Sequence, residues 1–226
     1  MANLKRLILE FESPRSHPDR AARRHYLLTR SALPVLTYFW YKGVREYLED
    51  FVAHIDAPLL DILSITFFNQ IDFENTQLIR FINRTRRLKT LETARVTFAD
   101  RTIKIELSQT AVYRSLNVGI SCRELDWQLS FLEQICTPSF LSAVESLYIC
   151  GNQPSLPDRQ DDFENAQWLG ILHPFTAVKN LHLSEQFVPR IALALQELDG
   201  ERMTEILPIL RNIFLEGLQP TAGSVP

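Results

Sequence analysis

The sequence has little of what most enzymes and secreted proteins require. It contains only 3 cysteines and 7 glycines in 226 residues. No glycine belongs to a GxGxxG or GxxxxGK[ST] phosphate-binding loop, and the GxSxG motif of a nucleophilic serine is absent. Cys122, Cys136 and Cys150 lack the CxxC or Cys/His spacing of a zinc site. We therefore expect three reduced, mostly buried thiols, and neither a metal nor a cofactor.

Long apolar runs are also missing. No run approaches the ~20 residues of a helix that spans a bilayer, and the first ten residues contain too short an apolar stretch for a signal peptide. These absences predict an intracellular protein, cytoplasmic or nuclear. The formal net charge of -3 argues against a general nucleic-acid or membrane-surface binder. It leaves room for a local basic patch.

Side chains that could take part in catalysis do not form a pattern. The 5 histidines are scattered along the chain. Asp161, Asp162 and Glu164 are close together, but they lie at a predicted helix start, where negative charge is favourable to the helix dipole. We therefore expect no enzymatic activity and no catalytic residues.

The sequence is rich in one short pattern, apolar-x-x-apolar-x-apolar. Its clearest copies lie at 33–43 and 207–217, and both begin with Leu-Pro and end with Gly. The alternation predicts a strand with one buried face. A helix pattern usually follows, such as 44–55, and Asn75 is the predicted N-cap of another helix. The first apolar position of each copy is Leu4, Leu36, Leu60, Leu91, Tyr113, Val144, Val178 or Leu210.

Repetition at roughly 20–35 residues is typical of a solenoid, in which neighbouring units share one core. We predict a single domain over 1–226. It is an α/β solenoid with a curved, mostly parallel sheet of about eight strands and helices on the convex side. Residues 99–108 are predicted to form an antiparallel hairpin, the one exception to the parallel sheet. Residues 13–32 are predicted to form a basic loop insertion, and residues 219–226 a flexible tail.

Residues between the apolar positions should point to the exposed, concave side of the sheet. Aromatic and arginine side chains on such a face resemble the anchors of protein interfaces. The predicted partner-binding residues are Tyr38, Trp40, Arg95, Tyr148, His182 and Phe214, and the row that contains most of them also includes Ile8 and Ser64. Two alternatives remain open: the hairpin or the basic loop folds across these residues, or another domain packs on them.

The basic loop is a second candidate site. The segment contains only one acidic residue, Asp19, so its arginines carry a local positive charge that could bind nucleic acid or another acidic partner. The alternative is a solvated loop without a ligand. The cations concerned are Arg15, Arg20, Arg23, Arg24 and Arg30.

Several segments resemble the leucine-rich-repeat region of fungal F-box proteins. They are Leu-Pro-x-Leu at 33–36, Ile-Asp-Ala-Pro-Leu-Leu at 55–60, Cys-Arg-Glu-Leu-Asp-Trp at 122–127 and Leu-His-Pro-Phe-Thr-Ala-Val-Lys-Asn-Leu at 172–181. In that family an F-box docks onto the adaptor of a cullin-type ubiquitin ligase, and the repeats select the substrate. The resemblance implies substrate selection for ubiquitin transfer.

The chain also departs from that family. No Leu-Pro-x-Glu-Leu-Leu run of an F-box occurs in it, and the Asn or Cys that normally follows each strand is mostly absent. Contact with a ligase adaptor would therefore need an F-box outside this chain. The alternative is an orphan leucine-rich-repeat scaffold fragment without ligase association.

Overall fold

Strands and helices alternate along the chain in the computed structural model, which describes residues 3–11, 30–68, 75–109, 111–122, 125–136, 141–151, 165–196 and 206–217. The elements are β1 (Arg6–Glu10), β2 (Ser31–Ala32), β3 (Tyr38–Gly43), α1 (Arg45–Ala53), β4 (Ile55–Asp56), β5 (Ile62–Phe68), α2 (Thr76–Arg84), η2 (Arg86–Leu88), β6 (Thr93–Ala99), β7 (Thr102–Gln109), β8 (Arg114–Ser121), α3 (Leu125–Ile135), β9 (Ser146–Gly151), α5 (Asn165–Leu172), β10 (Asn180–Ser184), η4 (Glu185–Phe187), α6 (Val188–Gln196) and β11 (Asn212–Glu216).

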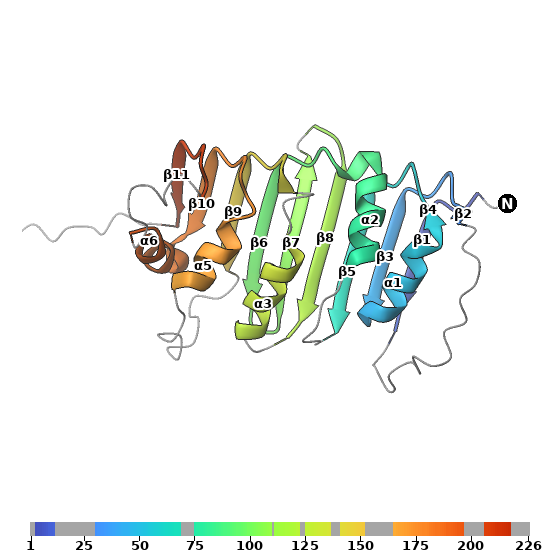
Figure 1. The fold of residues 1–226 in the computed structure, drawn as a ribbon, viewed down its shortest axis with the longest axis horizontal. Helices are drawn as coiled ribbons and strands as arrows, with labels where there is room; N and C mark the ends of the chain where they lie inside the picture. The colour runs from blue at the N-terminus through green and yellow to red at the C-terminus, as the bar shows by residue number, and fades with distance from the viewer. Residues whose placement is uncertain are drawn as a thin grey trace, which may run out of the picture.

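One large sheet runs through the molecule, in the strand order β1-β3-β5-β8-β7-β6-β9-β10-β11 (Figure 1). Every neighbouring pair is parallel except the two that involve β7. The mixed α/β class and the mostly parallel sheet are thus as predicted. The hairpin predicted at 99–108 corresponds to the antiparallel pair β6 and β7, whose turn is at Asp100 and Arg101. It supplies a ninth strand to a sheet predicted to have about eight.

The strand order departs from the chain order at the centre of the sheet. β8 pairs with β5, and β6 pairs with β9, so that β6, β7 and β8 form an antiparallel meander between the two ends. Because each strand of a meander lies beside the one before it, the third strand lies farthest from the first. The connections β5-α2-β6 and β8-α3-β9 therefore each pass over two strands, and the repeats are not stacked one after another here.

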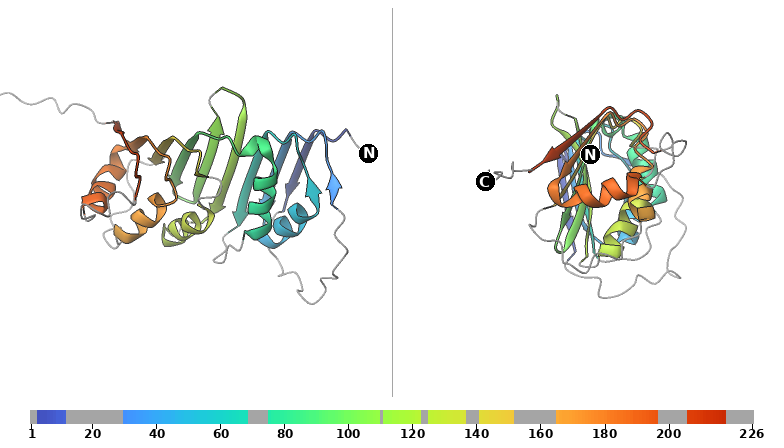
Figure 2. Two further views of the ribbon diagram at one scale, coloured as in Figure 1. Left: turned by 45° about the horizontal axis from the view of Figure 1, so that its top comes forward. Right: turned by 90° about the vertical axis from the view of Figure 1, so that its left-hand side faces the viewer.

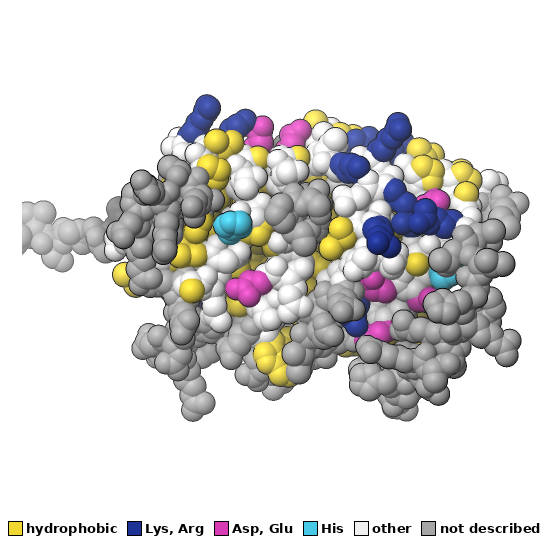
Figure 3. Space-filling model, in the orientation of Figure 1, with side chains coloured by type: hydrophobic (Ala, Val, Ile, Leu, Met, Phe, Trp, Pro, Cys, Tyr) yellow, Lys and Arg dark blue, Asp and Glu magenta, His cyan; other side chains and the backbone are white. Residues whose placement is uncertain are grey.

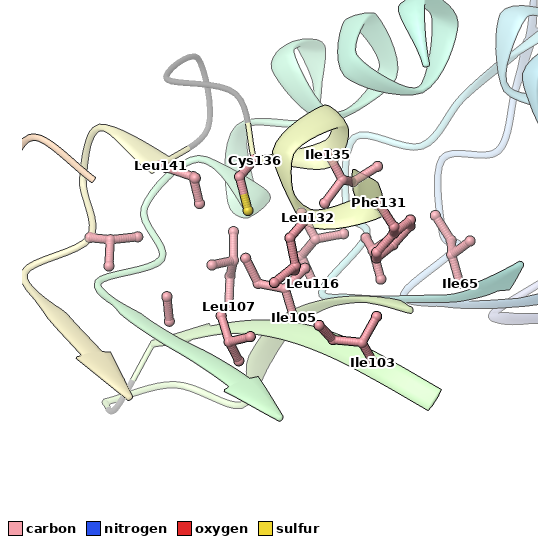
Figure 4. Packing of buried hydrophobic residues seen from close by; sticks show 14 of the residues in the cluster. Ile65, Ile103, Ile105, Leu107, Leu116, Phe131, Leu132, Ile135, Cys136 and Leu141 are labelled. Atoms are coloured by element: carbon pink, nitrogen blue, oxygen red, sulfur yellow. The ribbon is translucent and has the colours of Figure 1, made fainter. Parts of the chain in front are cut away.

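Helices cover one face of the sheet (Figures 1 and 2). The apolar positions of the repeats point toward these helices and are buried; Phe39, Leu63, Leu147 and Leu181 are fully covered. Figure 4 shows the centre of this core, where Phe131, Leu132 and Ile135 of α3 lie over side chains of β7 and β8. No described helix lies over the other face, which we call the open face.

Four apolar side chains that the pattern assigns to the core are instead exposed, and the first of them is Leu4, just before the edge strand β1. Tyr113 is 88% exposed because it lies between β7 and β8, where Val112 and Tyr113 make only isolated bridges to Gln109. Ile213 and Leu215 of β11 are 51% and 45% exposed. β11 is the last strand of the sheet, so the neighbouring strand that covers equivalent residues elsewhere is absent on one side.

The repeats share backbone hydrogen bonds as well as apolar positions. The amide of Leu36 donates to the carbonyl of Leu33 at 3.2 Å, and Leu210 makes the same turn with Leu207 at 3.0 Å. Equivalent turns precede β5, β9 and β10. In addition, a single backbone carbonyl just before a strand accepts hydrogen bonds from two consecutive backbone amides of the neighbouring repeat. The carbonyls concerned belong to Lys5, Thr37, Glu92, Glu145 and Lys179.

Two charged side chains connect α1 and α2 at opposite ends. The Glu49 carboxylate accepts hydrogen bonds from the amides of Gln77 and Leu78 at 2.7 and 2.8 Å. Asn75 is at the N-cap position as predicted, but its side chain makes no capping bond, so Glu49 satisfies these amides instead. Burial, partly offset by the two bonds, raises the pKa of Glu49.

Arg84 makes the second connection, from the end of α2 to the end of α1. Its guanidinium donates to the carbonyls of Val52 and Ile55 and lies 2.7 Å from a carboxylate oxygen of Asp56. Val52 lies in the last turn of α1, and Ile55 and Asp56 follow the helix. No amide within the helix forms hydrogen bonds with these acceptors.

Only the end of the predicted basic loop is described. Ser31 and Ala32 form β2, which pairs with β4 in a separate two-stranded sheet. The rest of that loop, through residue 29, and the predicted tail at 219–226 lie outside the described residues.

Candidate functional site

A single row of side chains crosses the open face through the middle of every strand. The pairing registers place all the predicted residues except Tyr38 in this row, in the order that the repeat implies, and Tyr38 lies in the preceding row, opposite Arg6 and Ile62. The meander adds Asn117 of β8 and Glu106 of β7 between Ser64 and Arg95. The spacing of the repeats does not predict these two residues in the row. The alternation at 103–107 indicates that Glu106 points to the open face. Its position between Ser64 and Arg95 follows only from the order of the strands in the sheet.

Four of the predicted residues form a continuous stack, which we call the stacked row. The Arg95 guanidinium lies 4.6 Å from the ring centroid of Tyr148. The rings of Tyr148 and His182 are 4.0 Å apart at an interplanar angle of 13°, and those of His182 and Phe214 are 4.4 Å apart at 15°. Flat groups at equivalent positions stack in this way because parallel neighbours are about 4.8 Å apart.

The stack determines which parts of the rings a ligand can reach. The faces of Tyr148 and His182 are covered by their neighbours, so their edges point to solvent. Phe214, at the last strand, is 45% exposed and has a neighbour on only one side in the row. Each stacked contact contributes about 0.5–1.5 kcal/mol and fixes a rotamer. A partner that binds here would lose little side-chain entropy on this side of the interface.

Polar groups border the stacked row. His182 Nδ1 lies 3.5 Å from Glu216 Oε1 on one side. On the other side, Asn212 Nδ2 donates to Asn180 Oδ1 at 2.9 Å, and Asn180 Nδ2 donates to Ser146 Oγ at 3.3 Å. The arrangement is an aromatic centre that ends in an arginine and has a polar margin, and tyrosine, phenylalanine and arginine are residue types enriched in protein interfaces.

Tyr38 and Trp40 lie at the other end of the sheet, on β3. The Arg6 guanidinium lies 4.8 Å from the ring centroid of Tyr38, and Trp40 is half-buried beside Ile8, which is 56% exposed. Four strand spacings, about 19 Å, separate Trp40 from Arg95. The six predicted residues therefore form two groups, the stacked row and a smaller one on β1 and β3.

The structure decides one alternative left by the sequence. The hairpin does not fold across the open face, because β6 and β7 lie within the sheet. Of the predicted basic-loop residues, Arg15, Arg20, Arg23 and Arg24 lie outside the described residues. Arg30 is exposed, and its Nε donates to the carbonyl of Ala53 at 3.4 Å.

The described residues give no evidence for two other kinds of site. Among these residues there is no group of three or more His, Cys, Asp or Glu side chains that could hold a metal ion. None of the helices in the described part of the chain is long and apolar enough to cross a membrane. Comparison of the chain with protein-family models, curated proteins and solved structures gave no match.

Thiol reactivity should report on the stacked row. Cys150 is half-buried, and its Sγ lies 3.3 Å from Arg95 Nη1, whereas Cys122 and Cys136 are buried. Burial raises the pKa of Cys136 to about 12 and raises that of Cys150 as well, but the Arg95 cation acts in the opposite direction on Cys150. At pH 8 we expect a disulfide reagent to modify Cys150 first, and Arg95→Met to slow this reaction, since removing the cation raises the pKa further.

The rate of colour release from the native protein and its dependence on pH measure both effects. Denatured protein, in which all three thiols should react alike, is the control. Equal rates for the three thiols in the native protein would contradict the burial of Cys122 and Cys136. An unchanged rate in the Arg95→Met variant would show that the guanidinium does not act on Cys150.

Proposed function

We propose that this chain recognises a protein partner on its open face and has no catalytic activity. The stacked row carries the proposal. Arginine, tyrosine and phenylalanine are side-chain types found at the centres of protein interfaces, and here they are held in place before binding. A binder of unpaired nucleotides would need free ring faces on which bases can stack. Since the faces of Tyr148 and His182 are already occupied, a partner that contacts ring edges fits better.

We further propose that the sheet and its helices form a leucine-rich-repeat-like solenoid, with the open face as its concave side. The equivalent turns at Leu33–Leu36 and Leu207–Leu210 support this, as do the carbonyls that accept two amides from the next repeat. The meander of β6, β7 and β8 is then an insertion between two stacks of repeats, one on each side.

The partner is best identified by proximity labelling in cells, followed by binding measurements with variants. Tyr148→Ala and Trp40→Ala should each weaken binding of the recovered partner about tenfold or more, as interface anchors do. Tyr113→Ala is the matched control, because this tyrosine is 88% exposed and precedes β8 rather than lying in the row. Unchanged binding by both open-face variants would exclude this face as the site.

The leading proposal for the cellular role is substrate selection for ubiquitin transfer, in the cytoplasm or nucleus. Its support is the resemblance of several segments to the repeats of fungal F-box proteins. The alternative role is a scaffold without ligase association. Affinity purification of the full-length gene product distinguishes them: recovery of a cullin-ligase adaptor supports the first, and its consistent absence supports the second.

A further inference from the structure

Positive charge gathers on the helix side of the sheet, away from the open face. Residues 80–89 contain five cations, and 78–91 contain no acidic residue. Figure 3 shows lysine and arginine side chains collected over the part of the molecule where Figure 1 places α2. We name this surface the α2–η2 patch, and it consists of Arg80, Arg84, Arg86, Arg87 and Lys89.

Two members of the patch are held by carboxylates below them. Arg84 lies 2.7 Å from Asp56, and Arg87 Nη1 donates to both carboxylate oxygens of Asp61 at 2.9 Å. Arg114 shares Asp61, with its Nε 3.3 Å from Oδ1. These pairs fix the arginine side chains and so supply an ordered base for the patch.

The other three members form no such ion pair, although the charge of Arg80 acts on the carboxylate of Glu49 in α1. Arg80, Arg86 and Lys89 are exposed and form no ion pair with any described residue. Arg30 extends the positive surface. Burial is the largest cause that lowers the pKa of Arg84, and the positive charge of Arg30 is the second. The last arginine of the predicted basic loop is therefore close to the α2–η2 patch.

We infer that the α2–η2 patch binds the phosphate backbone of a nucleic-acid duplex. Four of its five cations are arginines, whose planar guanidinium can bind phosphate oxygens through two parallel hydrogen bonds. Backbone binding needs cations and little else, and it is compatible with a chain whose overall charge is slightly negative when the cations are local.

The apolar residues of the same elements favour a duplex over two other ligands. Leu78, Phe81, Ile82 and Leu88 are buried and Ile79 is half-buried, so no large exposed apolar side chain gives the patch the apolar centre of a protein interface. For the same reason α2 and η2 present no exposed aromatic ring on which an unpaired base could stack. An acidic protein segment is the competing ligand that the experiment must separate.

The test is fluorescence anisotropy of a labelled duplex of about 20 base pairs, titrated with the full chain between about 50 and 200 mM salt. Arg80→Gln/Arg86→Gln/Lys89→Gln should weaken binding at least tenfold at low salt. It should also reduce the slope of log Kd against log salt by about 2–3, near 0.9 for each lost phosphate contact. A labelled poly-aspartate peptide is measured in parallel and should bind more weakly than the duplex.

The control variant removes the same charge elsewhere. Lys5→Gln/Arg101→Gln/Arg211→Gln replaces three exposed cations outside the patch and should change duplex affinity less than twofold. Equal weakening by both triple variants would show a response to net charge and overturn the inference. So would the absence of duplex binding at low salt, or tighter binding of poly-aspartate than of the duplex.

Two further measurements keep this test independent of folding and of the proposed protein recognition. The unfolding midpoint of the patch variant should equal that of the parent, and Arg86→Gln alone should reproduce part of the loss. Tyr148→Ala should leave duplex affinity unchanged because its side chain is on the open face. If Tyr148→Ala abolished duplex binding, the duplex would be bound by the open face and the inference would fail.

Discussion

Replacing Leu181 with alanine should lower the free energy of unfolding by about 2–5 kcal/mol. Leu181 lies in β10 between β9 and β11, and its side chain is fully buried. Its truncation removes apolar contacts and leaves a cavity that a close-packed core closes only in part. Leu63 of β5 is equally buried, and Leu63→Ala should have an effect of the same size. Urea denaturation followed by circular dichroism measures both.

The same substitution on the surface provides the control. Leu193 of α6 is 56% exposed, so Leu193→Ala should change stability by only about 0.5 kcal/mol. Trp40→Ala, on the open face, should also cost clearly less than Leu63→Ala. If Trp40→Ala were as destabilising as Leu63→Ala, the assignment of the two faces of the sheet would be wrong.

Replacing Arg84 with methionine should cost about 1.5–3 kcal/mol, the range for hydrogen bonds to a charged group. The substitution keeps most of the apolar stem but leaves the carbonyls of Val52 and Ile55 and the carboxylate of Asp56 without this donor. Arg84→Lys should fall between the parent and Arg84→Met, since an ammonium group cannot satisfy three acceptors in the geometry of a guanidinium.

Two measurements separate this connection from a general effect of charge. Arg86→Met removes an exposed arginine two residues away and should change stability by no more than about 0.5 kcal/mol. Amide hydrogen exchange should become faster at the end of α1 and in β4 in the Arg84→Met variant. Equal stability losses in the two variants would mean that the contacts between α1 and α2 through Arg84 contribute nothing of their own.

Local pattern accounts for the parts of the fold that the sequence predicts well. Alternation has a period of two in any strand, so it assigns Leu63 and Ser64 to opposite faces without knowledge of their neighbours. The repeat then places residues of the same phase in one row. For this reason Tyr148, His182 and Phe214 could be grouped from sequence, although their stacking geometry could not.

The features that sequence missed depend on residues far apart in the chain. The N-cap rule considers a helix and its own flanking residues, whereas α2 receives its capping bonds from Glu49, 28 residues before Gln77. Strand order is likewise a long-range property. Because the meander lies between β5 and β9, Trp40 and Arg95 are distant, and nothing in the spacing of the repeats indicates that separation.

The separation of the two groups on the open face sets a minimum size for what binds there. A ligand that touches both Trp40 and Arg95 must extend about 19 Å across the strands. An extended peptide covers that distance with about six residues at roughly 3.3 Å each. A metabolite of ordinary size would reach one group and leave the other in water. Loss of binding in both Trp40→Ala and Tyr148→Ala would therefore indicate a partner at least as large as a short polypeptide.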